Sequence, residues 1–576
     1  MIDTYYQEEL HNLREASAAF ARAHPALAPM LGEPSADPDV ERLLEGVAFL
    51  TGMIRGKLDD DFPEIIHGLM DLVFPHLLLP VPSASILAFR PKPNLRQTLR
   101  VEAGTTVASI PVDGTTCRFR TTQPVEVHPL RLTSVETPPR AGRTSRIRLS
   151  FQLDGLTLAT WRPSELVLHL GESLAEATTL HLLLTRHLEG IQVVPAAGGS
   201  VWNLPPSALE RVGFDPDEGL LPLPGQTFGG FRLLQDYFVL PQKHLFLALR
   251  GWDQWRDRGG GSAFDLVLEL GPAPVETPRL RPEHFVLFAT PIVNLFKAEA
   301  EPVLLDHQQE RVRIQAAGYP PDHARVFTVD RVVGYAQGSV NRRAYAPMDT
   351  FARGGWDPAV YQVRRGRSQL DGAPETHLSF SYPLDAPGPE LETLTVHLTC
   401  TNGTLPSRLQ VGEICRQTEE SSELLDFGNL LAPTLPPEQV LDRNNLWKLL
   451  SHLNLNLGSL TRPGNLQGLL TLYAQQGSDR ASLPGHLKRI EGLRSLVAEP
   501  ADLLVRGRMY RGQHLVLEGD PACFASLGDL HLFAAVLERF LAAFSSLNTF
   551  TRFTLKEAPL GETTPWPARL GDRPLS

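Results

Sequence analysis

The chain has 576 residues, of which 42% are hydrophobic and 21% are charged, and its net charge is −11. This composition is typical of a globular protein, and the length predicts about three or four domains rather than one core. The negative charge argues against a nucleic-acid partner, because nucleic-acid binders carry a basic face or a high isoelectric point. The most apolar run, residues 69–82, contains Asp71, His76 and prolines and is too short to span a membrane.

The cysteines and the N-terminus indicate a cellular compartment. Four cysteines, at 117, 400, 415 and 523, lack metal-site spacing and are too few for a disulfide framework. They predict a reducing environment and mostly buried thiols. Residues 1–10 lack the basic and apolar regions of a secretory signal. We therefore expect a cytoplasmic protein that does not insert directly into a membrane.

Residues 1–82 form a predicted helical N-terminal region. A first helix spans residues 6–20, and a second begins at Asp37, an N-cap residue followed by Pro38 at the first helical position. Apolar residues recur along the second helix at steps of three and four, which is the pattern of an amphipathic helix; they are Val40, Leu44, Val47, Thr51, Ile54 and Leu58. This stripe must be buried against its own domain or against another chain.

From Ser83 onward the hydrophobic pattern alternates residue by residue, as it does in strands. Short strands separated by turn residues predict two β-rich, sandwich-like domains, at residues 83–289 and 290–436. The predicted strands include residues 85–90, 166–170, 180–184, 264–270, 326–333 and 394–400. Helical periodicity returns in residues 437–576, with a strand at 515–518, which predicts a mixed α/β C-terminal domain. The expected fold class is multidomain α+β.

No motif in the sequence indicates catalysis. Phosphate-binding loops, zinc-protease motifs and nucleophile elbows are absent from the sequence. The acidic run 59–61 reads as a charged helix end rather than as a cation site, because consecutive helical side chains point in different directions. His76, His307 and His452 stand beside apolar residues without a partnered acid. We expect a protein that is not an enzyme and binds no cofactor or metal.

Several blocks of residues carry a family resemblance. The N-terminal blocks are Tyr5-Tyr6-Gln7-Glu8-Glu9-Leu10, Asp37-Pro38, Val40-Glu41-Arg42-Leu43-Leu44-Glu45-Gly46, Lys57-Leu58-Asp59-Asp60 and Phe62-Pro63-Glu64. Later blocks are Tyr237-Phe238 with Pro241 and Lys243, Pro291 to Phe296, Cys400-Thr401-Asn402-Gly403, Leu446-Trp447 and Val536 to Phe540. In their order and spacing, the blocks resemble the TssF family, baseplate subunits of the bacterial type VI secretion system.

This resemblance implies an assembly protein. It implies a wedge in which two TssF copies join one TssG, together with TssK and TssE, around the VgrG spike, where the wedge anchors and primes a contractile sheath. It also implies a place at the inner membrane, where the baseplate docks on the membrane complex. The amphipathic helix is then the candidate interface with TssG and the second TssF copy, through Val40, Arg42, Leu44, Glu45, Val47, Phe49, Thr51, Ile54, Lys57, Leu58 and Phe62.

Two other functions stay open at this stage. One is the corresponding wedge protein of a contractile phage tail or a phage-like injection particle. The other is a hydrolase built on β-sandwich modules, which requires a pair of carboxylates at the mouth of a sheet. Asp236 and Asp265 are candidates for such a pair.

Overall fold

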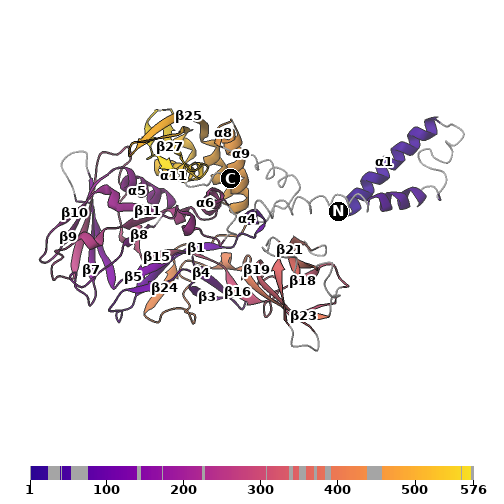
Figure 1. Cartoon of the computed structure of the whole chain (residues 1–576), viewed down its shortest axis with the longest axis horizontal. Helices are drawn as coiled ribbons and strands as arrows, with labels where there is room; N and C mark the ends of the chain where they lie inside the picture. The colour runs from indigo at the N-terminus through magenta and orange to yellow at the C-terminus, as the bar shows by residue number, and fades with distance from the viewer. Residues whose placement is uncertain are drawn as a thin grey trace. The chain divides into compact units, whose positions relative to one another are not determined.

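The computed structural model describes residues 2–23, 39, 42–52, 75–138, 145–171, 173–222, 228–306, 308–336, 342–348, 359–368, 373–382, 391–437, 457–462, 464–559 and 561–571. The chain divides into two compact units. The first comprises residues 1–75 and 441–453, and the second comprises residues 76–440 and 454–576. Helices and strands are mixed along the chain, with many separate sheets (Figure 1). The α+β class is therefore confirmed, whereas the division into four domains stays a prediction.

The first unit contains helix α1 (Ile2–Ala23). Leu10 is buried and Tyr6, Leu13 and Ser17 are half-buried, at steps of three and four, while His11 between them is exposed. This one-sided burial is what the apolar pattern of residues 6–20 predicts. Residues 42–52 are also helical, which confirms the second predicted helix over that stretch. The third predicted helix, residues 63–79, is described only from residue 75, where α4 (Pro75–Leu78) lies.

The second unit is built mainly from antiparallel sheets. One five-stranded sheet has the order β24 (Leu425–Asn429), β1 (Ala84–Pro91), β15 (Ala289–Val293), β4 (Thr115–Thr121) and β3 (Thr106–Val112). Its second strand, β1, is buried on both faces over most of its length. The buried hydroxyl of Ser85 is satisfied because it donates to the Leu431 carbonyl at 2.7 Å. The sheet thus joins parts of the chain that are more than three hundred residues apart in sequence.

Three further sheets are formed by strands that lie between β1 and β15 in the sequence. A five-stranded sheet has the order β10 (Trp202–Leu204), β9 (Leu188–Pro195), β13 (Ala263–Leu270), β7 (Ser145–Leu153) and β6 (Leu130–Glu136). A four-stranded sheet has the order β11 (Leu209–Val212), β12 (Phe246–Leu249), β8 (Leu166–Leu170) and β14 (Phe285–Leu287). Strands β2 (Leu99–Val101) and β5 (Val125–Val127) pair with each other. These strands confirm the predictions for residues 166–170 and 264–270.

An eight-stranded sheet follows in the sequence and has its own hydrophobic core. Its strands are β16 (Phe296–Glu299), β17 (Val303–Leu305), β18 (Val312–Ile314), β19 (Arg325–Ala336), β20 (Arg342–Pro347), β21 (Val360–Arg367), β22 (Pro374–Ser381) and β23 (Glu392–Thr401). Inward-facing residues of β23, such as Leu394, Val396 and Leu398, are buried at every second position. This alternation is the signal that predicted strands at 326–333 and 394–400.

The C-terminal part of the chain contains both helices and strands. Its sheet contains β25 (Leu493–Val505), β26 (Arg508–Gly519), β27 (Thr549–Glu557), β28 (Thr563–Pro565) and β29 (Arg569–Leu570). Strands β26 and β27 are parallel, so the chain crosses over between them through a helix, as parallel neighbours require. That helix is α11 (Leu527–Ala542), and α8 (Leu457–Leu460), α9 (Asn465–Gly477) and α10 (Leu483–Glu491) precede the sheet in the sequence.

One predicted strand is wrong. Residues 180–184 lie in helix α5 (Leu174–Arg186), where Leu180 to Leu184 are all buried. A short run that is buried on every side has the same sequence pattern in a strand and in a core helix. The helix start is marked instead by Ser173, whose hydroxyl accepts from the N–H of Glu176 at 3.3 Å, an N-cap that favours the helix.

The remaining helical elements are short, apart from α6 (Gly229–Val239). The 3₁₀ helices are η1 (Pro206–Ala208), η2 (Pro216–Glu218), η3 (Pro241–His244), η4 (Trp252–Gln254), η5 (Pro282–His284), η6 (Leu405–Arg408) and η8 (Pro521–Cys523). Each contains a proline at its first or second position except η4, and proline is tolerated there because the missing N–H has no helical partner anyway.

Candidate partner interface

The predicted interface helix is described over residues 42–52. The predicted interface residues in this stretch are Arg42, Leu44, Glu45, Val47, Phe49 and Thr51; Leu44 is half-buried and the others are exposed. The remaining predicted residues, Val40, Ile54, Lys57, Leu58 and Phe62, lie outside the described residues. Arg42 lies 3.5 Å from Asp39 in an exposed ion pair, which contributes little to stability.

The chain covers only one side of the apolar stripe on this helix. Ala48 is fully buried, and Leu44, one turn before it, is half-buried. Leu43, Val47 and Leu50 lie one row further round the helix and are 69%, 43% and 60% exposed. Consecutive helical residues are about 100° apart, so these three side chains form a continuous row beside the buried one. We call Leu43, Val47 and Leu50 the exposed row; the sequence pattern placed Leu43 and Leu50 only beside the stripe.

A buried ion pair occupies the interior of the second unit. The Lys243 Nζ atom lies 2.7 Å from Asp236 Oδ2 and donates to the Gly213 carbonyl at 3.1 Å. Asp236 Oδ2 also accepts from the Leu220 N–H at 3.1 Å. The two charged side chains are 1% and 2% exposed. The pair holds α6, η3 and two loops together, which gives a structural reason for the sequence block around residues 237–243.

The carboxylates of the hydrolase hypothesis are both used in ion pairs. Asp236 is the buried counter-ion of Lys243, and Asp265 on β13 faces Arg148 at 3.8 Å. A glycoside hydrolase requires two carboxyl groups about 5–10 Å apart across one substrate bond. Asp236 lies on α6 with its carboxylate directed to Lys243 and Leu220, so its geometry is that of a structural counter-ion.

Two asparagines from separate sequence blocks meet in the interior. Asn294 Nδ2 donates to the Arg118 carbonyl and to Asn402 Oδ1, each at 2.8 Å. Its Oδ1 accepts from Thr401 Oγ1 and from the Asn402 N–H, each at 2.7 Å. Both asparagines are completely buried, and buried amides are stable only when they are hydrogen-bonded in this way. The network connects the end of β15 with the end of β23 and with β4.

Of the three histidines considered from the sequence, His76 is described, whereas His307 and His452 lie outside the described residues. His76 Nε2 lies 3.0 Å from the Tyr473 hydroxyl, and its ring is nearly parallel to those of Tyr473 and Phe231, with centroids 6.1 and 6.2 Å away. Burial lowers the pKa of His76 to about 3. The imidazole is therefore neutral near pH 7 and packs against the neighbouring aromatic rings.

Within the part of the chain that the structure describes, no group of three or more His, Cys, Asp or Glu side chains is arranged to hold a metal ion. The acidic run 59–61 lies outside that part. None of the described helices is long and apolar enough to cross a membrane. The four thiols are free; Cys117 and Cys400 are buried, but Cys415 is exposed, contrary to the expectation of mostly buried cysteines.

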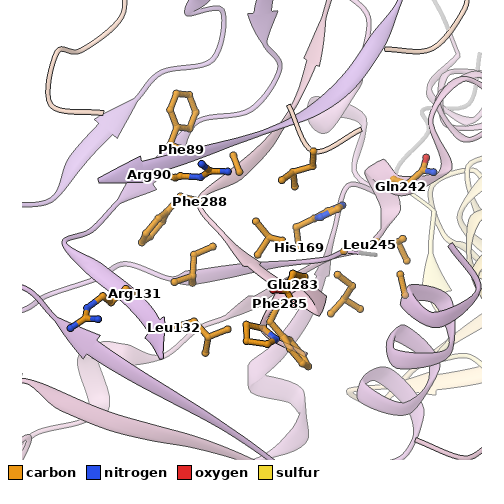
Figure 2. A pocket seen from close by; sticks show the side chains of 18 of the residues that line it. Phe89, Arg90, Arg131, Leu132, His169, Gln242, Leu245, Glu283, Phe285 and Phe288 are labelled. Carbon is orange, nitrogen blue, oxygen red and sulfur yellow. The ribbon is translucent and has the colours of Figure 1, made fainter. Parts of the chain in front are cut away.

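A pocket of about 810 Å³ opens in the second unit, close to the end of β1 and along β14 (Figure 2). Its wall is mainly apolar and includes Leu132, Leu245, Phe285 and Phe288. The buried imidazole of His169 on β8 also contributes to the wall. The volume is in the range of ligand pockets, about 300–1,000 Å³, and nothing in the sequence pattern pointed to it.

Comparisons with known proteins agree with one another. The family model described as "Type VI secretion system, TssF" matches residues 1–573. The type VI secretion system component TssF1 of Pseudomonas aeruginosa is 31% identical, over 99% of this chain and 98% of that protein.

Two solved structures resemble the chain along most of its length. One is a chain of the TssK-TssF-TssG baseplate subcomplex of the type VI secretion system, with a TM-score of 0.78 and 28% identity over 92% of this chain and 98% of that one. The other, from the baseplate complex of the same system, has a TM-score of 0.62 and 26% identity over all of both chains. The fold and the relatives thus define the class, a component of the type VI secretion baseplate. The chain belongs to the TssF family.

Proposed function

We propose that this chain is a structural subunit of the baseplate wedge and assembles with TssG and TssK. The observation that carries the proposal is the match of 92% of the chain, with a TM-score of 0.78, to a chain of the TssK-TssF-TssG subcomplex. The arrangement of buried ion pairs and amides as internal ties, rather than as a reactive cleft, supports a structural and non-enzymatic role. In the wedge, two copies of the chain join one TssG, and TssE and the VgrG spike complete the assembly at the inner membrane.

The candidate contact with TssG and with the second TssF copy is the helix around residues 42–52. The other predicted interface residues precede and follow this stretch in the sequence. Its exposed row, Leu43, Val47 and Leu50, supports this choice because a contiguous apolar row is seldom left in water without a partner. Phe49 adds a large apolar side chain that is 48% exposed. Apolar positions at i, i+4 and i+7 are the anchors by which an amphipathic helix docks into a groove or bundle.

The test replaces Val47 and Leu50 together by Asp in a chain that is co-expressed with a tagged TssG. Burying two carboxylates in a helix interface is strongly unfavourable. We therefore expect the amount of recovered TssG complex to fall at least about tenfold, which corresponds to a loss of about 1.4 kcal/mol in binding free energy. Leu304→Asp is the matched control, because Leu304 is 54% exposed on β17 outside this helix. Full recovery of TssG by the folded double variant contradicts the proposed interface.

A further inference from the structure

Strands β1 and β14 form a fork in the second unit. Consecutive strands β14 and β15 belong to different sheets, because β14 pairs with β8 while β15 pairs with β1. Phe288 stands between them with a left-handed backbone (φ 56°), which bends the chain at this point. Strand β1 follows β15 as far as Phe89, whose N–H donates to the Phe288 carbonyl at 3.0 Å. Beyond that bond β1 continues to Pro91 alongside β24, while β14 turns away.

The pocket of about 810 Å³ occupies this fork. Residues 88–91 of β1 line one side of it and residues 285–288 line the other. Figure 2 shows Phe89 and Arg90 on the one strand and Phe285 on the other, with Phe288 near their junction. The floor is apolar and includes Leu174 at the start of α5. The divergence of β1 and β14 therefore leaves an apolar slot between two sheets.

Both sides of the fork have backbone groups that point into it. The Gly171 N–H donates to the His284 carbonyl, and hydrogen-bonded pairs alternate along an antiparallel ladder. Leu287, three residues after His284, therefore directs its N–H and C=O away from β8 and toward the fork. By the same alternation, the bond from Lys92 N–H to the Leu424 carbonyl leaves the Pro91 carbonyl facing the fork. Among the described strands, none pairs with β14 on this side.

The polar side chains of the pocket are also incompletely satisfied. His169 is 2% exposed and lines the pocket; its ring faces the Gln242 backbone through one nitrogen, and the other nitrogen has no hydrogen-bond partner among the described residues. Arg90 on β1 and Glu283 on η5 lie on the pocket wall, and neither is in an ion pair with another described residue. A neutral imidazole offers one donor and one acceptor. The slot thus combines a free strand edge, a buried polar group and two unpaired charges of opposite sign.

We propose that the fork binds an extended segment of a partner protein, which pairs its backbone with Leu287 and places a bulky apolar side chain in the pocket. A free strand edge is recognised by another polypeptide backbone, and side-chain pockets beside the edge give specificity. An acidic residue of the segment faces Arg90, and a basic residue faces Glu283. The choice of TssG and TssK as the partners to be tested rests on the proposed function.

The proposal is tested with a photo-cross-linking amino acid, p-benzoylphenylalanine, in place of Leu287. The chain is co-expressed with TssG and TssK, the complex is isolated through a tag on TssG, and cross-linked peptides are identified by mass spectrometry. We expect a cross-link from position 287 to a partner peptide with an apolar residue next to an acidic one. The same amino acid at Leu304, which does not line the pocket, is the control and should not give this product.

The outcome of this experiment distinguishes a failure of the fork proposal from a failure of the proposed function. An intact complex in which position 287 reacts only with residues of the same chain, with a second copy of it or with nothing contradicts the fork proposal alone. A chain that recovers neither TssG nor TssK contradicts the proposed function and the fork proposal together.

A second set of variants closes the slot. Leu174→Trp puts a larger side chain into the floor from a half-buried position, and we expect the partner cross-link at position 287 to fall about tenfold while the complex still forms. Arg90→Glu changes an exposed residue, so folding is retained, and we expect a severalfold decrease from charge repulsion with the acidic residue of the segment. Unchanged cross-linking in both folded variants overturns the proposal.

Discussion

At the scale of single residues, several polar groups in the interior are paired over long distances in the sequence. Asn294 and Asn402 are 108 residues apart and share a hydrogen bond of 2.8 Å. Such pairs hold together segments that have no local reason to meet. Because an unpaired buried polar group costs more than a paired one contributes, each pair makes the correct tertiary arrangement more favourable than its alternatives.

The Asp236–Lys243 pair gives a prediction at this scale. Lys243→Met leaves the Asp236 carboxylate buried without its counter-ion, and we expect the free energy of unfolding to fall by about 3–5 kcal/mol. Asp236→Leu should have an effect of similar size. The double variant removes both charges, so its loss should be smaller than the sum of the two single losses. Urea unfolding followed by circular dichroism measures all four proteins, and strictly additive losses contradict the account.

At the scale of elements, the packing of α5 against α11 depends on a glycine. A β-carbon on Gly528 would lie 2.2 Å from the Thr178 carbonyl oxygen on α5. Gly528→Ala therefore forces the two helices apart, and we expect a loss of about 1–3 kcal/mol. Thermal unfolding of the purified chain measures the effect.

Gly468 provides the matched control for that prediction. It is exposed inside α9, and a β-carbon there meets nothing within 4 Å. Gly468→Ala should stabilise the chain by about 0.5–1 kcal/mol, because alanine loses less backbone freedom than glycine when a helix forms. A destabilising Gly468→Ala, or a neutral Gly528→Ala, is incompatible with the described packing.

Local sequence patterns predicted some of these elements and not others. The alternation of apolar and polar residues predicted strands such as β8, β13 and β23. In each of them buried positions recur at every second residue over part of the strand. This pattern failed for α5, where burial on all sides removes the helical signal. The pairing of β1 with β24, and the pocket beside β14, depend on which distant strands meet. Local periodicity contains no such information.

The interface helix illustrates the same limit. Periodicity predicted an apolar stripe that includes Leu44 and Val47, and the described residues 42–52 are helical as expected. Periodicity does not tell which part of a broad stripe the chain itself covers. The structure buries the side with Ala48 and leaves Leu43 and Leu50 exposed. The exposed row is therefore a result of the tertiary structure, and its role as a contact with TssG stays a proposal.

At the scale of the whole molecule, buried histidines predict how stability depends on pH. Burial lowers the pKa of six of them: to about 3 for His76 and His181, to about 4 for His128, His169 and His486, and well below the usual value for His244. In the unfolded chain each histidine binds a proton at a pH of about 6.5. The unfolded state then binds more protons than the folded state below that pH, so stability rises with pH.

We therefore expect stability to be fully present above pH 6.5 and to be lost as the pH falls toward about 4. The midpoint of urea unfolding, measured in steps from pH 8 to pH 5, checks the prediction. His181→Leu removes one buried imidazole and should reduce the slope of the midpoint with pH below 6.5. A midpoint that stays level from pH 6.5 to pH 5 contradicts the burial of these histidines.

The similarity to known baseplate structures extends over the whole chain. Its resemblance to chains of two baseplate complexes covers 92% to 100% of its length, so the complete fold, rather than one module, is shared with them. Two surfaces are proposed to bind partners: the helix that leaves Leu43, Val47 and Leu50 exposed, and the fork, where no described strand pairs with the outer edge of β14. We propose above all that this chain functions inside a complex with TssG.

Native mass spectrometry of the chain co-expressed with TssG and TssK tests that claim most directly. The proposed function predicts a particle that contains two copies of this chain for each TssG, together with TssK, and that loses TssG when Val47 and Leu50 are replaced by Asp. A folded chain that is recovered only as a free monomer, with TssG present in the same cells, contradicts the account.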